Sequence, residues 1–380
     1  MTTTRIITAT AEAATATLQL DYLPPEQLSS QPASWWQNVL GVVGFGGPPR
    51  IDGVQVPVTA SMTPPLRPAD DLCEVWRVTG HPVRLSNGPA GQGRVHYRYC
   101  EDLLFGAITL DERLLGPGTA GQGGIDPGGA DAAALSRATE IAYQEIFAVL
   151  RRTEHRHLIR IWNYLPEINR ETGGDERYRQ FNSARQLAFR KSGQATVGTV
   201  PAAGALGSPA GSPISIYFLA ARQASKMLEN PRQTSAYHYP PKFGRHSPTF
   251  SRACLLNASA GTRLFVSGTA SIVGHETIHR GDVDAQTRET MANIDALLDE
   301  ANRLAGPARY SLDGLKFKVY VRRPSDLGVI EGVLSRSLRP STPIVYLQAD
   351  VCREDLLVEI EASGAPSDEA DCQRLAGFAD

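Results

Sequence analysis

The sequence has few cysteines, and none lies at a spacing that metal sites or disulfide frameworks use. There are five in 380 residues, an odd number, widely separated and without a CxxC pair. Small secreted domains that depend on disulfides carry a dense and even set, and zinc sites place their cysteines in close pairs. The sequence therefore predicts a chain without disulfides or a zinc centre, in a reducing compartment such as the cytoplasm.

Long apolar runs and an excess of charge of one sign are also missing. No run approaches the ~20 residues that span a bilayer, and the N-terminus lacks the basic start and apolar core of a signal peptide. The formal net charge of −2 gives no overall field that would attract nucleic acid or an anionic membrane. We therefore expect no nucleic-acid partner, no membrane association and a cytoplasmic location.

What is present is an ordinary globular composition in a repeating order. The chain is 42% apolar and 21% charged, and its 380 residues are long for one hydrophobic core. The patterns in residues 94–219 predict strand, strand, helix, strand, helix, strand, and residues 251–361 repeat this order with a further closing strand. We predict two α+β units, each a mixed β-sheet covered by helices. Residues 1–225 would form the N-terminal unit and residues 226–380 the C-terminal unit, with the active site between or near both.

Residues 229–252 combine arginine and tyrosine side chains with several prolines. A packed core would favour aliphatic residues here, and a solvated loop would not need the tyrosines. Arginine and tyrosine donors on a rigid backbone suit a small ligand that carries carboxylate or other oxygen groups. The candidate binding residues of this segment are Arg232, Tyr237, Tyr239, Arg245 and Arg252.

The first unit supplies further candidates. Arg160 and Tyr164 lie on an apolar strand, and Tyr217 lies on the last strand predicted for this unit. Arg177 and Arg185 are about two turns apart on a predicted helix, so they also fit a solvated helix face. Arg160, Tyr164 and Tyr217 are therefore the better candidates for a pocket wall.

The last predicted strand carries two glutamates among aliphatic residues. A period of two places Leu357, Glu359 and Glu361 on one face and the aliphatic residues on the other, which must face the core. In the simplest interpretation both carboxylates are solvated. The preceding segment weakens that interpretation because it brings Asp350 and Cys352 close by. A carboxyl group held on a rigid strand beside apolar neighbours has a raised pKa and can act as a general acid.

One string, His275-Glu276-Thr277-Ile278-His279, is superficially similar to a zinc-protease motif. It follows a glycine-rich strand end and does not clearly lie on a helix, which that motif requires. We therefore predict that the protein holds no metal ion, and that His275 orients a neighbour or caps the turn.

Residues 262–362 resemble the YjgF/RidA family. The similarity rests on the strings SGTASIV, QTRETMANIDALLDEA, KFKVYVRRPSDL and DLLVEIEA. The imine deaminases of that family carry an arginine shortly after the proline of the penultimate strand. Residues 341–346 of this chain read STPIVY and contain none, so imine hydrolysis is disfavoured.

A wider resemblance, from about residue 35 to the end, is to the chorismatases. The similar strings are RIWNYLPEIN, ERYRQFNSARQLAF, PAAGALG, YFLAAR, ENPRQTSAYHYP, RHSPTFSRA, LFVSGTASIVGHET and DLLVEIE. The resemblance implies two YjgF/RidA-like units and the substrate chorismate, whose carboxylates need arginine and tyrosine donors. It also implies that Glu359 protonates the enolpyruvyl methylene carbon and that pyruvate leaves, with no cofactor.

Two positions distinguish the subfamilies that this resemblance suggests. Members that form 3-hydroxybenzoate carry glycine in the SGTAS-like strand and a cysteine seven residues before the acid. Members that form trans-3,4-dihydroxycyclohexa-1,5-diene carboxylate carry alanine and lack the cysteine. Gly268 and Cys352 place this chain with the first group, with Cys352 assisting aromatisation. The diene product and 4-hydroxybenzoate stay as alternatives, and Cys352 is otherwise a small buried apolar residue.

A different class of function is also open, namely a YjgF-like module that binds a small carboxylate without turning it over. The oligomeric state is open as well. Proteins similar to YjgF assemble as trimers with sites between subunits, and a doubled chain can satisfy part of that packing internally. We therefore expect a monomer or a homotrimer.

Overall fold

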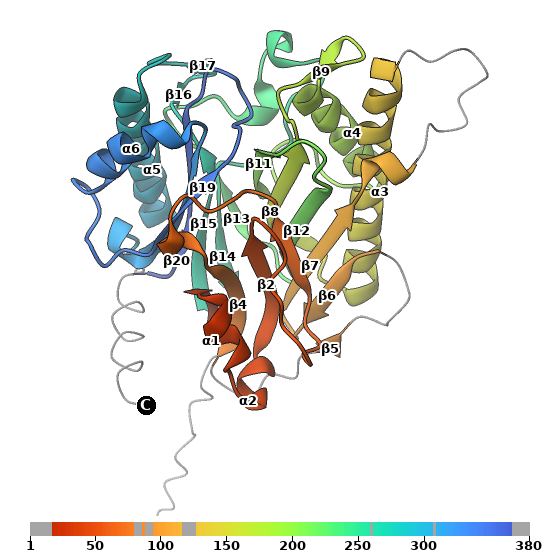
Figure 1. The fold of residues 1–380 in the computed structure, drawn as a ribbon, viewed down its shortest axis with the longest axis vertical. Coiled ribbons are helices and arrows are strands. Elements are labelled where there is room, and N and C mark those ends of the chain that lie inside the picture. Colours follow the sequence, from red (N-terminus) through yellow and green to blue (C-terminus); the bar gives the residue numbers. More distant parts are fainter. Residues whose placement is uncertain are drawn as a thin grey trace, which may run out of the picture.

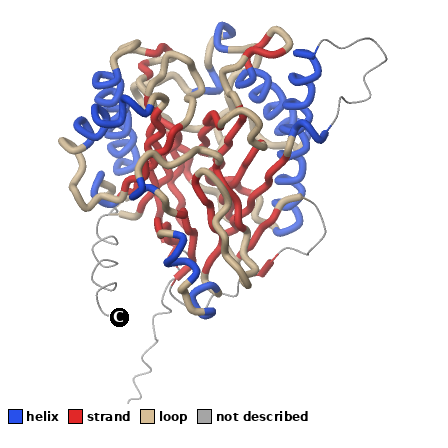
Figure 2. The backbone as a smooth tube through the Cα atoms, in the orientation of Figure 1, coloured by secondary structure: helices blue, strands red, loops and turns tan. Residues whose placement is uncertain are grey.

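The computed structural model describes residues 17–79, 86–87, 94–115, 127–258, 261–306 and 309–366. Strands fill the middle of the molecule, and the longer helices lie on two opposite flanks (Figure 1). Figure 2 shows the same division by secondary structure, with strands between two groups of helices. The larger sheets are a four-stranded sheet near the N-terminus and two six-stranded sheets.

The first six-stranded sheet has the order β11-β8-β12-β7-β6-β5, in which β8 and β11 are parallel and the other neighbours antiparallel. Helix α3 packs on it through buried side chains at helical spacing, such as Leu135, Ala138, Ala142 and Ile146. The elements of this unit are β5 (Ser86–Asn87), β6 (His96–Tyr99), β7 (Leu103–Leu110), α3 (Pro127–Thr153), β8 (His157–Pro166), α4 (Arg177–Lys191), β11 (Ala202–Ser208) and β12 (Ile214–Ala221).

The second six-stranded sheet has the order β13-β14-β15-β20-β18-β19, in which β18 and β19 are parallel. Helix α5 starts where the side chain of Asp282 accepts a hydrogen bond from the backbone N–H of Ala285 at 3.0 Å. The elements are β13 (Lys226–Leu228), β14 (Ala253–Ala258), β15 (Gly261–Thr269), α5 (Val283–Leu304), β18 (Leu315–Val321), α6 (Leu327–Leu334), β19 (Ile344–Gln348) and β20 (Val358–Gly364).

The two units share one topology. Strands β6-β7-β12-β8-β11 of the first sheet correspond in sheet order to β14-β15-β20-β18-β19 of the second. Along the chain, one long helix comes after β7 or β15 and a second helix comes after β8 or β18. The predicted α+β fold of two repeated units is therefore confirmed. Strand β12 ends at Ala221 and β13 joins the second sheet from Lys226, and the boundary predicted between residues 225 and 226 falls between these strands.

The four-stranded sheet, of order β1-β4-β2-β3, is a third layer that was not predicted from the sequence. Its short strands lie between proline- and glycine-rich turns, so no long pattern marks them. Trp76 of β4 nonetheless lies 5.8 Å from Trp162 of β8 and 5.9 Å from Phe265 of β15, between ring centroids, so all three sheets share one core. The elements are β1 (Thr17–Leu23), α1 (Pro25–Ser29), α2 (Ala33–Trp36), β2 (Val39–Phe45), β3 (Val58–Ser61) and β4 (Cys73–Thr79).

Candidate active site

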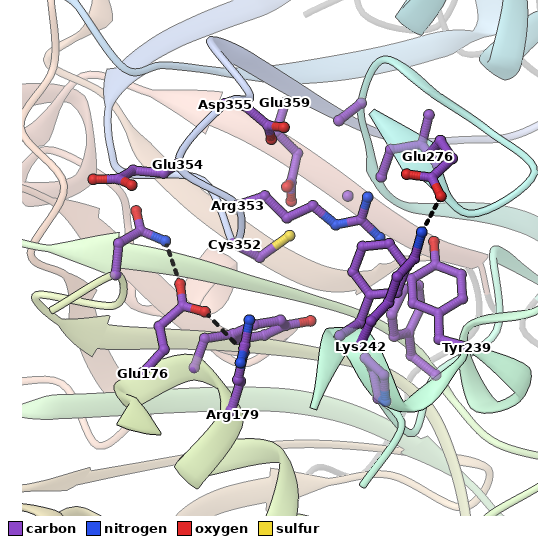
Figure 3. Close-up of a pocket in the computed structure, with 18 of the residues that line it drawn as sticks. Glu176, Arg179, Tyr239, Lys242, Glu276, Cys352, Arg353, Glu354, Asp355 and Glu359 are labelled. Atoms are coloured by element: carbon purple, nitrogen blue, oxygen red, sulfur yellow. Dashed lines mark hydrogen bonds and ion pairs between the residues drawn. The ribbon is translucent and has the colours of Figure 1, made fainter. Parts of the chain in front are cut away.

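A cavity of about 520 Å³ opens between the two units. Two short hairpins contribute to its lining, and both lie at the same end of the molecule (Figure 1). They are formed by β9 (Glu171–Thr172) with β10 (Asp175–Glu176), and by β16 (Ile272–Val273) with β17 (Glu276–Thr277). Residues 352–355 and the side chain of Glu359 complete the wall (Figure 3). A cavity of this size suits a small organic ligand.

Glu359 reaches the cavity from β20 beside an irregular point in the neighbouring strand. The pairing of β15 with β20 shifts register between Val266 and Thr269, and Gly268 lies in the shifted stretch. A Cβ atom placed on Gly268 would be 1.9 Å from Oε1 of Glu359. Glycine therefore leaves room for a carboxyl group that lines the cavity although its residue is only 4% exposed.

Burial sets the protonation of this carboxyl group. Desolvation, followed by the negative charge of Glu361, raises the pKa of Glu359 to about 8. Arg160, Arg252 and Arg322 act in the opposite direction without outweighing burial. At neutral pH Glu359 therefore carries a proton, which it can donate to a ligand in the cavity.

The predicted binding residue Arg160 lies behind this site instead of in the cavity wall. Its Nη2 donates to Oε2 of Glu361 at 2.5 Å, Trp162 Nε1 donates to Oε1 at 2.8 Å, and Lys318 Nζ is 2.5 Å from the same Oε1. Burial alone would raise the pKa of Glu361, but Lys318 and Arg160 hold that pKa below its usual range. Glu361 is therefore an ionised partner in a buried network.

Tyr164 and Tyr217 belong to the same buried network. The hydroxyl groups of Tyr164 and Tyr320 are 2.8 Å apart, and Lys318 Nζ donates to the Tyr217 hydroxyl at 2.8 Å. The Tyr217 hydroxyl also donates to Glu74 Oε2 at 3.3 Å. The strands were predicted correctly, but their pattern does not show which sheet face meets the cavity and which meets the core.

Two candidates of the arginine and tyrosine segment line the cavity, Tyr239 and Arg252. Nη2 of Arg252 donates to the Tyr239 hydroxyl at 2.7 Å and to the carbonyl oxygen of Thr234 at 3.0 Å. These bonds fix the guanidinium group against the wall. Arg252 and Tyr239 thus present a rigid pair of donors to the cavity, and Gly268 lies in the same wall.

The other three candidates of the segment are not among the residues that line this cavity. Arg232 pairs with Glu289 and donates to Oδ1 of Asn293 at 2.6 Å, which ties its loop to helix α5. Tyr237 packs its ring against His238, with 4.7 Å between centroids. Arg245 follows Gly244, the turn residue after a short 3-10 helix. The segment therefore divides into a part that lines the cavity and a part that supports the loop.

Cys352 lines the same cavity as Glu359, and Figure 3 shows both side chains in it. Burial raises the pKa of the Cys352 thiol to about 12, and the charge of Glu359 acts in the same direction. The thiol is therefore neutral near pH 7. It can donate a weak hydrogen bond or a proton, but it is not a thiolate nucleophile.

Arg353 is a cavity residue that sequence reasoning missed. Its Nη1 donates to the carbonyl oxygen of His275 at 2.9 Å and to Oγ1 of Thr277 at 3.2 Å, and its guanidinium carbon lies 4.1 Å from the ring centroid of Phe243. Its Nη2 is buried without a hydrogen-bond partner. An arginine beside the candidate Cys352 was the available signal. The free donor and the position in the wall make Arg353 a candidate carboxylate ligand.

Sequence reasoning also did not select several other residues that line the cavity. Tyr178 and Arg179 begin helix α4, and Lys242 and Phe250 lie in the arginine and tyrosine segment. Arg179 and Lys242 are held by glutamates of the two hairpins, as the dashed lines in Figure 3 mark. Their stretches stood out in the sequence, but only the fold shows which side chains turn inward.

The histidine string lies in the β16–β17 hairpin and the turn after it, and His279 has a φ of 58°. This backbone is not helical, so the two histidines are not arranged as in the zinc-protease motif. In the residues that the structure describes, no three His, Cys, Asp or Glu side chains are grouped so that they could hold a metal ion. Within that same part of the chain, no helix has the length and apolar character to cross a membrane.

Known proteins resemble this chain over most of its length. A family model described as "Chorismatase FkbO/Hyg5-like, N-terminal" matches residues 74–220. A 3-hydroxybenzoate synthase from Streptomyces hygroscopicus is 40% identical over 235 residues, which are 60% of this chain and 68% of that protein. A chorismatase from Streptomyces rapamycinicus is 33% identical over 349 residues, 88% of this chain and 95% of that one. A crystal structure of a chorismatase has a TM-score of 0.76 at 29% identity and covers 93% of this chain and 100% of its own.

The relatives show that this chain is an enzyme, and its two-unit α+β scaffold has a cavity in which a carboxyl group of raised pKa lies with arginine side chains. The relatives identify the group of enzymes. The chain belongs to the chorismatase family.

Proposed function

We propose that this protein converts chorismate to 3-hydroxybenzoate and pyruvate. The observation that carries the proposal is Glu359, a carboxyl group that is protonated at neutral pH and lies against Gly268 in the cavity. The relatives whose names are chorismatase and 3-hydroxybenzoate synthase support the same reaction class.

Glu359 is the general acid of the proposed reaction. It donates its proton to the methylene carbon of the enolpyruvyl group, which leaves an oxocarbenium-like cation. The bond between the ring and the ether oxygen then breaks, its electrons pass to that oxygen, and pyruvate leaves. The ring hydroxyl oxygen attacks the electron-poor ring carbon and its proton returns to Glu359, which gives an epoxide across the two carbons. The bond between this oxygen and its original carbon then breaks. The proton on the carbon that now carries the oxygen is transferred to that oxygen, which restores aromaticity. The two products contain every atom of chorismate, so no water is consumed.

Substrate orientation requires donors for two carboxylates. Of the binding residues predicted from the sequence, we assign direct contacts to Tyr239, Arg252 and Gly268, which line the cavity, and we add Arg353 with its free Nη2. Arg160 and the residues bound to it act from behind the wall, through Glu361. The arginines also stabilise a dianion in a cavity whose acid is uncharged before the reaction.

Cys352 is the second catalytic group of the proposal. Because its thiol is neutral, it can pass a proton while the ring hydroxyl attacks and the ring aromatises, and it does not compete with that hydroxyl as a nucleophile. This role applies only to the aromatic product. Formation of the non-aromatic dihydroxy acid would instead add a water molecule to the ring.

Turnover of chorismate tests the proposal. We expect purified protein to release pyruvate, followed with a coupled lactate dehydrogenase assay, and an equal amount of 3-hydroxybenzoate, identified by NMR and mass spectrometry. Absence of pyruvate would overturn the proposal, and stabilisation by chorismate against heat without any product would favour a binding protein. Pyruvate together with a dihydroxy acid or with 4-hydroxybenzoate would overturn only the product.

A further inference from the structure

Arg322, at the end of β18, holds the segment that carries Cys352. Its Nη2 donates to the carbonyl oxygens of Val351 and Arg353, both at 2.9 Å, so the two bonds flank Cys352 on either side in the chain. Its Nε donates to the carbonyl oxygen of Leu356 at 2.7 Å. One planar guanidinium group thus spans the backbone of the whole segment.

Both terminal nitrogens of Arg322 connect the segment to the first unit through Asn169. Nη1 donates to Oδ1 of Asp350 at 2.7 Å and to Oδ1 of Asn169 at 3.1 Å. Asn169 lines the cavity and in turn donates to Glu176 at 3.0 Å. Arg322 is itself outside the cavity lining, so its role is indirect. It fixes the distance between the Cys352 segment and the opposite wall of the cavity.

Of the other side chains that hold this segment, Arg353 bonds to His275 and Thr277 through its own guanidinium group, and the rest act on the later part. Gln286 of α5 donates to the carbonyl oxygen of Asp355 and accepts from the N–H of Leu357, each at 2.8 Å. The hydroxyl of Thr277 donates to Oδ1 of Asp355 at 3.0 Å. In the described part of the chain, no side chain besides Arg322 donates to the carbonyl groups on both sides of Cys352.

Glu359 is held by different forces. It lies inside β20, where its partner across the antiparallel ladder is Tyr320 of β18, and the next pair, Ile360 with Thr269, ties β20 to β15. A sheet ladder of this kind does not depend on one side chain. The acid and the thiol therefore have separate supports, and one of them can be loosened while the other stays in place.

We propose that Arg322 is a positioning residue that places Cys352 against the substrate and so determines which product follows pyruvate release. The proposal rests on the proposed function, in which the thiol acts only in the aromatising branch. When Cys352 is displaced, water adds to the ring cation in place of the internal attack, and the balance shifts from 3-hydroxybenzoate to the dihydroxy acid. Protonation by Glu359 precedes this branch and continues.

The variant Arg322→Lys tests the proposal, because it keeps the positive charge but cannot bracket Cys352 with a planar fork. We expect the share of 3-hydroxybenzoate among the products to fall several-fold more than the rate of pyruvate release. We also expect alkylation of Cys352 by iodoacetamide, read by peptide mass spectrometry, to become roughly tenfold or more faster, since hydrogen bonds to a charged group are lost. The matched control is Arg323→Lys. Arg323 is the next residue in the chain and is exposed, so this substitution should change neither readout.

The readouts separate this proposal from the proposed function. If the unmodified protein releases no pyruvate, the proposed function fails, while the alkylation rate still shows whether Arg322 holds the segment. An unchanged product ratio together with unchanged alkylation in Arg322→Lys would overturn the positioning role, and so would an equal loss of both products. If Arg322→Lys does not fold, Asp350→Asn, at a side chain that is 47% exposed, removes one charged partner of Arg322 and should shift both readouts less in the same direction.

Discussion

Two glutamates on one strand, Glu359 and Glu361, have opposite chemistry in this molecule. They lie two residues apart on the same face of β20, and they are almost equally buried, at 4% and 3% exposed. Burial and a like charge raise the pKa of Glu359 to about 8, whereas two cations hold that of Glu361 below its usual range in spite of burial. Burial alone therefore does not decide which carboxyl group keeps its proton.

The difference lies in the partners. Glu361 and Glu74 share Lys318, whose Nζ is 2.5 and 2.6 Å from their oxygens, and Arg160 pairs with Glu361 at 2.5 Å. Two negative and two positive charges thus balance in a network that joins all three sheets. Among the described residues, by contrast, no side chain forms a hydrogen bond or ion pair with the carboxyl group of Glu359, which faces the cavity. Strand β20 therefore carries one ionised and paired carboxylate, Glu361, and one protonated carboxyl group that faces the cavity, Glu359.

Removing the acid should give the largest effect. The variant Glu359→Gln keeps the shape of the side chain but has no acidic proton, so we expect the kcat for pyruvate release to fall about 10²–10⁴-fold. The KM for chorismate should change little, because the arginine donors remain. The control is Glu354→Gln, at an exposed residue that also lines the cavity. Near-normal turnover of Glu359→Gln would show that another group is the acid.

Breaking the structural partner should destabilise the protein without removing the acid. The variant Glu361→Gln leaves Lys318 and Arg160 with one carboxylate fewer in a buried site, so we expect the free energy of unfolding to fall by about 3–5 kcal/mol. Urea denaturation followed by circular dichroism measures this change. The control Glu300→Gln removes an exposed ion pair with Arg303 and should cost less than about 1 kcal/mol. A loss as small as that of the control would show that the buried network does not stabilise the fold.

The raised pKa of Glu359 predicts a pH dependence that separates the two glutamates. A general acid acts only while protonated, so the pyruvate-release rate should be constant near pH 7 and fall about tenfold per pH unit above about 8. Since the charge of Glu361 helps to raise this pKa, Glu361→Gln should move the fall to lower pH. Rate profiles of kcat against pH for both proteins measure the shift. An unmodified protein whose rate falls already above pH 5 would contradict this assignment.

The same pKa affects stability with a definite sign. Glu359 binds its proton more strongly in the folded state, so its contribution to stability is present in full below the pKa of an unfolded glutamate and is lost as the pH rises through about 8. Glu361, with its lowered pKa, contributes above the unfolded pKa and loses that contribution as the solution becomes acidic. The two glutamates therefore respond to pH in opposite directions.

The sequence could predict part of this site. A period of two correctly places Glu359 and Glu361 on one face, and the repeated order of strands and helices indicates the two units. Which glutamate is the acid depends on Glu74, Arg160 and Lys318, which are far away along the chain and become neighbours only when the three sheets pack. The alternating pattern of a strand does not show what lies against each of its faces. The sequence therefore predicted Arg160 as part of the cavity wall, although it lies behind that wall.

The smallest of the predicted effects concerns the cations near the two glutamates. Lys318 and Arg160 are paired with protein carboxylates, whereas Arg353 lines the cavity and its buried Nη2 has no hydrogen-bond partner within the protein. The variant Arg353→Lys retains charge but loses the second nitrogen, so we expect the KM for chorismate to rise about tenfold or less while kcat changes little, the pattern of a lost binding contact.

A control for Arg353→Lys is available at the edge of the same cavity. Arg280 also lines it, but its side chain is 67% exposed and pairs with Asp355 at 3.0 Å, so Arg280→Lys should leave KM nearly unchanged. Steady-state kinetics of pyruvate release compare the two variants. Equal KM values for both would mean that the free nitrogen of Arg353 binds no carboxylate, and that Arg252 with Tyr239 supplies the directed contacts alone. A KM increase confined to Arg353→Lys would show that cations on the Glu359 side remain available to the ligand, while those around Glu361 are committed to the fold.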